Sequence, residues 1–177
     1  LNNWLLVLSV LSCFGCSSPV HEDDRGCAFV SDSIQYRVEF MSAGCVRILS
    51  FPEGDTLVTR RLVVDSEKPA FKDYKWEDTG QKLLFRTREL SVVFDKADVA
   101  FTFQETSTGK LLLKEKGDRK ARNFKRSVAG GEQCLEVTQR FVPTEDEAIY
   151  GLGQYQNGIM NYRGKSVLLL QANMDIV

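Results

Sequence analysis

The sequence predicts an all-β protein that folds as an antiparallel β-sandwich. From residue 33 onward, polar and apolar side chains alternate with a period of two, which is typical of strands that bury one face. After the first sixteen residues, no window of eleven or more residues has convincing helical periodicity. Turn residues divide this region into about nine short strands at near-regular spacing, and such a series favours a sandwich.

Residues 1–16 have the pattern of a lipoprotein-type signal peptide. The apolar run from Trp4 to Phe14 is shorter than the roughly 20 residues that a membrane-spanning helix needs, and it suits the h-region of an export signal. We expect cleavage before Cys16 and attachment of a lipid to its thiol. No Lys or Arg precedes the run, and the chain opens on Leu1 rather than Met. A truncated start would explain both features. The alternative is a buried N-terminal strand.

Such an anchor predicts an exported protein held at a membrane, in the periplasm or on the outer membrane or cell surface. Residues 17–26 are polar and are expected to form the tether between the lipid and the folded domain. His21 lies in this tether and is expected to be solvated rather than a ligand, and the same holds for the carboxylates of residues 22–24. The sandwich domain is then expected to cover residues 27–177.

The alternating segments predict the strands in chain order. Ser33–Phe40 and Cys45–Leu49 are joined by turn residues and predict the first hairpin. The other expected strands are Leu57–Val64, Leu83–Thr87, Leu90–Phe94, Val99–Phe103, Leu111–Leu113, Leu135–Phe141, Ala148–Tyr150 and Val167–Gln171.

Composition and charge exclude some classes of function. The chain of 177 residues is 43% hydrophobic, which excludes a disordered tail, and its formal net charge of −1 gives no reason to expect a polyanionic partner. Lys114–Arg126 holds seven basic residues, and we interpret it as a solvated loop rather than a nucleic-acid patch. No nucleic acid is expected as a partner.

The cysteines predict neither a disulfide framework nor a metal centre. If Cys16 carries a lipid, Cys27, Cys45 and Cys134 remain, an odd number whose spacing matches no zinc pattern. Cys45 and Cys134 lie in or beside strand-like runs and are expected to be buried thiols. No metal and no cofactor is expected, because no ligand constellation is present.

The segment 147–173 carries the clearest functional signal. Its glycines do not have the spacing of a dinucleotide loop, and no helix is expected after them, so phosphate binding is poorly supported. Tyr150 and Gln154–Gln156 place aromatic rings beside amide groups, a combination that suits the apolar faces and hydroxyls of sugars. Structural packing explains the same composition equally well.

The same segment resembles glycoside hydrolase family 31. The resemblance rests on EAIYGLGQ at 147–154, QNG at 156–158, NYRG at 161–164 and LQAN at 170–173. In that family a galactose-mutarotase-like β-sandwich precedes a (β/α)₈ catalytic barrel, and this stretch is similar to the end of the sandwich. The hairpin Ile34–Leu49 is similar to the family's early strands. With the lipoprotein-like leader, the Gln-rich form is most similar to the α-xylosidase and α-glucosidase branch.

The resemblance implies a retaining α-glycosidase that acts on oligo- or polysaccharides. In such enzymes two carboxyl groups about 5–5.5 Å apart act as nucleophile and acid. Both belong to the barrel, so no catalytic residue is expected in this chain, which should be inactive by itself and incomplete at its C-terminal edge. An α-linked glycan would bind through the barrel, and the sandwich would lend a loop to the pocket rim, with Tyr155 and Gln156 as candidates. Residues 27–177 alone are expected to aggregate or stay partly molten.

A lipid-anchored sandwich that is complete in itself is the alternative. Such a protein would bind carbohydrate or serve a structural role, and it explains the strands and the tether equally well. It leaves the motifs of residues 147–173 without an explanation.

Overall fold

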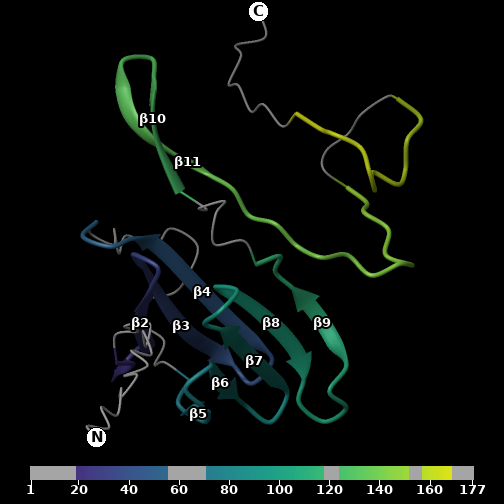
Figure 1. Ribbon diagram of the computed structural model, residues 1–177. Coiled ribbons are helices and arrows are strands. Elements are labelled where there is room, and N and C mark those ends of the chain that lie inside the picture. Colours follow the sequence, from purple (N-terminus) through teal and green to yellow (C-terminus); the bar gives the residue numbers. More distant parts are fainter. Residues whose placement is uncertain (1–18, 56–70, 118–123, 152–156, 169–177) are drawn as a thin grey trace, which may run out of the picture. The chain divides into compact units, whose positions relative to one another are not determined.

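A computed structural model of the chain describes residues 19–55, 71–117, 124–151 and 157–168 (Figure 1). Within these residues there are eleven strands and no helix, which confirms the expected all-β class. The chain divides into two units, one up to Phe141 and one from Val142, and each is described by itself.

The first sheet of the sandwich has four antiparallel strands in chain order. They are β1 (His21–Asp23), β2 (Gly26–Ser31), β3 (Ile34–Ser42) and β4 (Cys45–Pro52). The hairpin of β3 and β4 confirms the predicted one, with Ala43 and Gly44 between the paired residues Ser42 and Cys45. Gly26 is required where β2 begins, because its φ is +147° and a Cβ there would lie 2.1 Å from the carbonyl oxygen of Val38.

The second sheet has five antiparallel strands, again in chain order. They are β5 (Lys75–Asp78), β6 (Lys82–Arg86), β7 (Leu90–Asp95), β8 (Ala100–Glu105) and β9 (Leu111–Lys114). The four strands expected between residues 83 and 113 are therefore confirmed, while β5 lies in a segment too polar to predict as a strand. The expected strand Leu57–Val64 lies outside the described residues.

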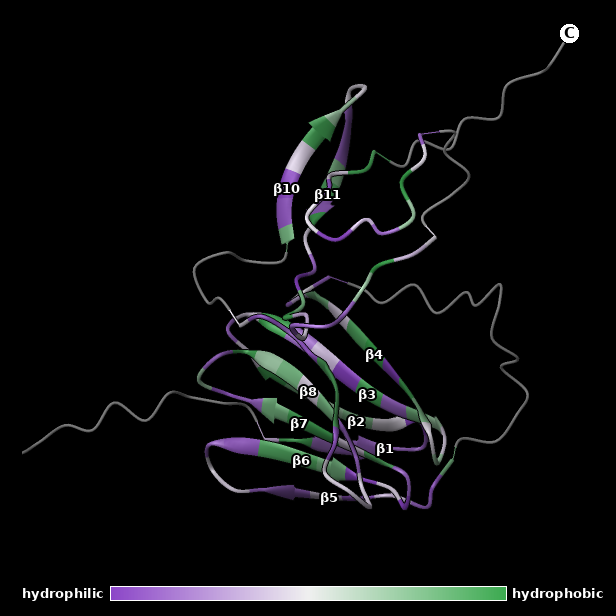
Figure 2. Ribbon diagram, turned by 90° about the vertical axis from the view of Figure 1, so that its right-hand side faces the viewer, coloured by the Kyte–Doolittle hydropathy of each residue, from purple (hydrophilic) through white to green (hydrophobic). Residues whose placement is uncertain are grey.

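The two sheets pack face to face and bury an aromatic core between them (Figure 2). Phe94 of β7 lies at its centre, with its ring centroid 4.8 Å from that of Phe29 and 5.1 Å from that of Tyr36, both in the opposite sheet. Phe101 packs against Phe94 at 4.9 Å. Because burying a Phe side chain is worth about 1.5–3 kcal/mol, these rings are a main source of the attraction between the layers.

The tether expected over residues 17–26 is wrong for its second half, because residues 21–23 form β1 and Gly26 opens β2. Asp23 accepts hydrogen bonds from the amides of Arg25 and Gly26, and its carboxylate pairs with both terminal nitrogens of Arg37 on β3. These bonds turn a polar segment into a strand. His21 is exposed, as expected.

Hydrogen bonds between side chains join the edge strands of the two sheets. Trp76 of β5 donates its indole N–H to Glu22 of β1 at 2.9 Å, and the Tyr74 hydroxyl donates to the same carboxylate at 2.8 Å. These two bonds hold the pKa of Glu22 below its usual range. Since neither edge strand has a further strand on its outer side among the described residues, the bonds fix β1 to β5 where the sandwich would otherwise be open.

A third element of the first unit is the hairpin of β10 (Phe124–Ala129) and β11 (Glu132–Val137). Gly130 and Gly131 form its turn, both with positive φ. The interpretation of Lys114–Arg126 as one solvated loop is wrong at both ends, because Lys114 belongs to β9 and residues 124–126 to β10. Every side chain of β11 is exposed, so the hairpin contributes little to the core.

Two further expectations are wrong. Cys45 and Cys134 are exposed, whereas Cys27 is buried. Cys45 directly follows a turn and Cys134 lies on the exposed hairpin, and alternation within a strand does not reveal either situation. Residues 148–150 form no strand, because the side chains of Asn161 and Arg163 bond the backbone at Ile149 and Glu147. Residues 167–168 form no strand either, and residues 169–171 lie outside the described residues.

Candidate functional site

The second unit, from Val142, is a loop that is braced by the residues of the family-like motifs. The guanidinium of Arg163 donates from one nitrogen to three backbone carbonyls, those of Thr144 at 2.7 Å, Glu145 at 2.9 Å and Glu147 at 2.6 Å. The carboxylate of Glu147 accepts the amide of Thr144 at 3.0 Å and closes this turn. The guanidinium of Arg163 thus supplies the hydrogen bonds that these three backbone carbonyls would receive from a neighbouring strand in a sheet.

Asn161 and Tyr162 hold the following residues in place. The side-chain oxygen of Asn161 accepts the amides of Ile149 at 3.1 Å and Arg163 at 3.0 Å. The Tyr162 amide donates to the Ile149 carbonyl at 2.8 Å, and its ring is 7% exposed. Its hydroxyl donates to Asn157 at 3.3 Å. The motif NYRG is therefore a structural clamp on the segment around Ile149.

The residues that sequence reasoning selected for the substrate rim fall in the sequence between the clamped residues Ile149 and Asn157. Tyr155 and Gln156 lie outside the described residues, as do Cys16 and the glycine and glutamine of the motif at 153 and 154. Gly151 and Asn157, on either side, are described, and Asn157 accepts the amide of Ile159 at 3.0 Å. The pattern of residue types indicated a loop of interest, but it did not indicate that Arg163 braces it.

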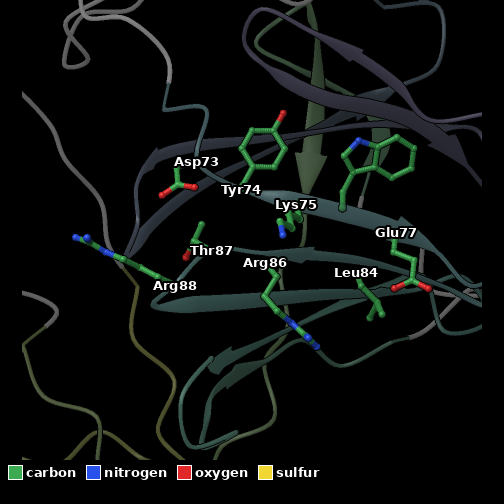
Figure 3. A pocket seen from close by; sticks show the side chains of 9 residues that line it. Asp73, Tyr74, Lys75, Glu77, Leu84, Arg86, Thr87 and Arg88 are labelled. Atoms are coloured by element: carbon green, nitrogen blue, oxygen red, sulfur yellow. The ribbon is translucent and has the colours of Figure 1, made fainter.

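A second site, which the sequence did not indicate, is a pocket of about 580 Å³ at the edge of the five-stranded sheet (Figure 3). It is lined by Asp73–Glu77 and by Leu84, Arg86, Thr87 and Arg88. Tyr74, which directly precedes β5, points toward the other sheet, whereas Lys75, Leu84 and Arg86 point to the opposite side (Figure 3). Trp76 of β5 packs against the core between the sheets. Of the charged side chains that line the pocket, Lys75 and Arg86 thus occupy the outer face of β5 and β6.

Two carboxyl groups of the sandwich, Glu39, which is buried, and Glu115, which is half-buried, are engaged in its own structure. Glu39 is 3% exposed and lies 3.6 Å from Arg47 and 4.0 Å from Arg37. Burial raises the pKa of Glu115, although its carboxylate accepts the amide of Phe101 at 2.8 Å and a side-chain bond from Gln139. Both groups are therefore structural rather than poised for acid–base chemistry.

The described part of the chain contains no group of three or more His, Cys, Asp or Glu side chains arranged to hold a metal ion. Among the described residues there is also no helix with the length and apolar character needed to span a bilayer.

Comparison with known proteins connects this fold to one family of enzymes. Residues 35–175 match the glycosyl hydrolase 31 N-terminal galactose mutarotase-like domain. An α-xylosidase of Saccharolobus solfataricus is 30% identical over 159 residues, a match that covers 81% of this chain and 20% of that protein. The chain thus spans about a fifth of the length of this curated relative.

Two solved structures have the same fold. A family 31 α-xylosidase from Xanthomonas citri superposes with a TM-score of 0.68 at 28% identity, over 87% of this chain and 17% of that one. A family 31 α-xylosidase from a soil metagenome, solved with xylose, gives a TM-score of 0.60 over 84% of this chain and 24% of that one, and at 20% identity it supports the fold alone. Because the match extends over most of the sandwich and the braced loop, the chain belongs to glycoside hydrolase family 31 as its N-terminal galactose mutarotase-like domain.

Proposed function

We propose that this domain is part of a retaining α-glycosidase that removes α-linked xylose or glucose from oligo- or polysaccharides. The observation that carries the proposal is the family match over residues 35–175, together with α-xylosidases at 30% and 28% identity. Retaining hydrolysis uses two carboxyl groups about 5–5.5 Å apart, as nucleophile and as acid. We assign both to the catalytic barrel and propose no residue of this chain as catalytic.

The contribution of the domain is to supply a loop to the rim of the substrate pocket. Arg163, Asn161 and Tyr162 brace the chain on either side of residues 152–156. A rigid support lowers the entropy that a loop loses when substrate binds. Tyr155 offers an aromatic face and Gln156 an amide, which are suited to the carbon face and the hydroxyls of a sugar.

Activity is tested on the complete polypeptide that carries this domain. We expect hydrolysis of p-nitrophenyl α-xyloside or α-glucoside, with the α-anomer formed first in a proton NMR time course. The ratio of kcat/KM for the two substrates identifies the preferred sugar, since they differ by one hydroxymethyl group. Formation of the β-anomer first, or absence of hydrolysis of both α-glycosides, contradicts the proposal.

The rim assignment has its own test in the same polypeptide. Tyr155→Ala and Gln156→Ala should raise KM more than they lower kcat, because they remove contacts made equally in the ground and transition states. Lys110→Ala, in the turn between β8 and β9, is the matched control and should change neither constant. Unchanged KM in both rim variants removes these residues from the rim.

We also propose that Cys16 carries a lipid that anchors the protein outside the cytoplasm. The support is the apolar run before Cys16 in the sequence. Four residues, 17–20, separate Cys16 from β1, so the sandwich would lie close to the membrane surface. Expression with radiolabelled palmitate should label the wild-type protein and leave Cys16→Ala unlabelled. Equal labelling of both proteins contradicts the anchor at this position.

A further inference from the structure

The charged pocket on the outer face of β5 and β6 is not used by the proposed hydrolysis. Lys75 and Arg86 are directly opposite each other in the antiparallel register. Both side chains are exposed and both point away from the core (Figure 3). Leu84, which is paired with Glu77 two residues along the same face, is half-buried and provides an apolar patch within the same pocket.

The pairing of Lys75 with Arg86 is unfavourable in the free protein. Like charges directly opposite each other on neighbouring strands repel and destabilise a sheet. Within the described residues, neither side chain forms an ion pair with a carboxylate, in contrast to Lys82 and Lys96, which pair with Asp95 and Asp78. An anion between the two cations would remove the repulsion and accept hydrogen bonds from both.

The backbone of the pocket is held in position from the other side. Tyr74 and Trp76, on either side of Lys75, are fixed by their hydrogen bonds to Glu22. Thr87, at the far end of the pocket, donates to the carbonyl of Ala43 at 2.5 Å and is 5% exposed. These hydrogen bonds order the backbone beside the pocket before a ligand binds. The conformational entropy that the protein loses on binding is therefore smaller.

The other charges of the pocket restrict the kind of anion that fits. Asp73 and Glu77 line the same pocket and would repel a second negative charge close to the first. Both are exposed, and as carboxylates they accept hydrogen bonds, which suits the hydroxyl groups of a ligand. The pocket therefore fits a ligand with one carboxylate, several hydroxyls and an apolar ring face for Leu84.

We propose that the outer face of β5 and β6 binds a uronic acid unit of a glycan, with its carboxylate between Lys75 and Arg86. The volume of about 580 Å³ accommodates a sugar of one or two rings. The site would let the sandwich itself hold an acidic branch of a polysaccharide. The proposal rests on the proposed function only in taking a glycan as the ligand. Binding of a uronic acid at this site and hydrolysis of α-glycosides are separate properties, and either can fail without the other.

The test is calorimetric titration of the complete polypeptide with methyl β-D-glucuronide and with methyl β-D-glucoside, its neutral counterpart. We expect the glucuronide to bind at least about tenfold more tightly, because a charge-assisted hydrogen bond is worth more than this factor. Lys75→Ala/Arg86→Ala should lose that difference, and Lys110→Ala should keep it. Equal binding of the two sugars, or an unchanged difference in the double variant, overturns the proposal.

Arg86→Glu separates loss of the site from loss of the fold. This substitution places opposite charges across the strand pair, so the melting temperature should stay the same or rise while glucuronide binding is lost. A lower melting temperature together with lost binding would overturn the assignment of Arg86 as a ligand. Acetate or phosphate that displaces the glucuronide at equal concentration overturns the sugar part of the proposal. Hydrolysis of α-xylosides should be unchanged in all these variants.

Discussion

At the scale of single residues, the three described cysteines differ in their surroundings. Cys27 is fully buried, and burial raises the pKa of its thiol to about 11, whereas Cys45 and Cys134 are exposed. The thiolate is the reactive form, so Cys27 should resist alkylation in the native protein. We expect iodoacetamide to label Cys45 and Cys134 in native protein and Cys27 only after denaturation, as measured by peptide mass spectrometry. Labelling of native Cys27 at the rate of Cys45 contradicts this placement.

Arg163 is the second residue whose role is specific enough to test. Arg163→Ala leaves the carbonyls of Thr144, Glu145 and Glu147 without their donor. Because the side chain is exposed and water can replace part of the loss, we expect a destabilisation of about 1–2 kcal/mol. Amide hydrogen exchange should become faster at Thr144 and Ile149 and stay unchanged in β7. Arg163→Lys keeps the charge but lacks the planar fork, and it should restore only part of the protection.

At the scale of strands, the attachment of β1 depends on the pairing of Asp23 with Arg37. These hydrogen bonds hold the pKa of Asp23 below its ordinary value of 3.8, so the pair stabilises the fold above that pH and the contribution is lost as the pH falls through the lowered pKa. Asp23→Asn keeps an acceptor for the amides of Arg25 and Gly26 but removes the charge. We expect it to lower the free energy of unfolding by about 1–2 kcal/mol at neutral pH. The difference should shrink toward zero in acid; a difference that is independent of pH would show that the charge contributes nothing.

The strands also show how far the sequence predicts the fold. Alternation found β3, β4, β7 and β8, because apolar residues at every second position of these strands pack into the core, as Val92 and Phe94 do in β7. It missed β1, β2, β5 and β10. The contact between β1 and β5 depends on bonds from residues 74 and 76 to Glu22, about fifty positions away, and local composition carries no sign of such partners. The sequence indicated the braced loop through its motifs. The pocket on the outer face of β5 and β6 depends on residues that only strand pairing brings together, so it became visible only in the structure.

At the scale of the whole sandwich, the apolar surface is unevenly distributed. The core is closed between the two sheets, whereas edge strand β9 exposes Leu111, Leu112 and Leu113 at 39%, 54% and 38%. The hairpin adds Val128 and Val137 at 70% and 61%. A strand edge and apolar side chains exposed together favour pairing with another chain, so we expect both elements to associate with other chains when nothing covers them.

This distribution predicts how residues 19–177, which include β1, behave when they are expressed alone. We expect concentration-dependent aggregation and strong binding of the dye ANS, measured by light scattering and fluorescence at a series of protein concentrations. Leu112→Lys should reduce the aggregation, because a charge on an edge strand opposes pairing between chains, and it should leave the melting temperature nearly unchanged since Leu112 is outside the core. Ser127→Lys, on a hairpin strand that is paired on its inner side with β11, tests whether the hairpin contributes in the same way. Soluble monomer that unfolds sharply and reversibly, without ANS binding, would show that these apolar surfaces need no cover.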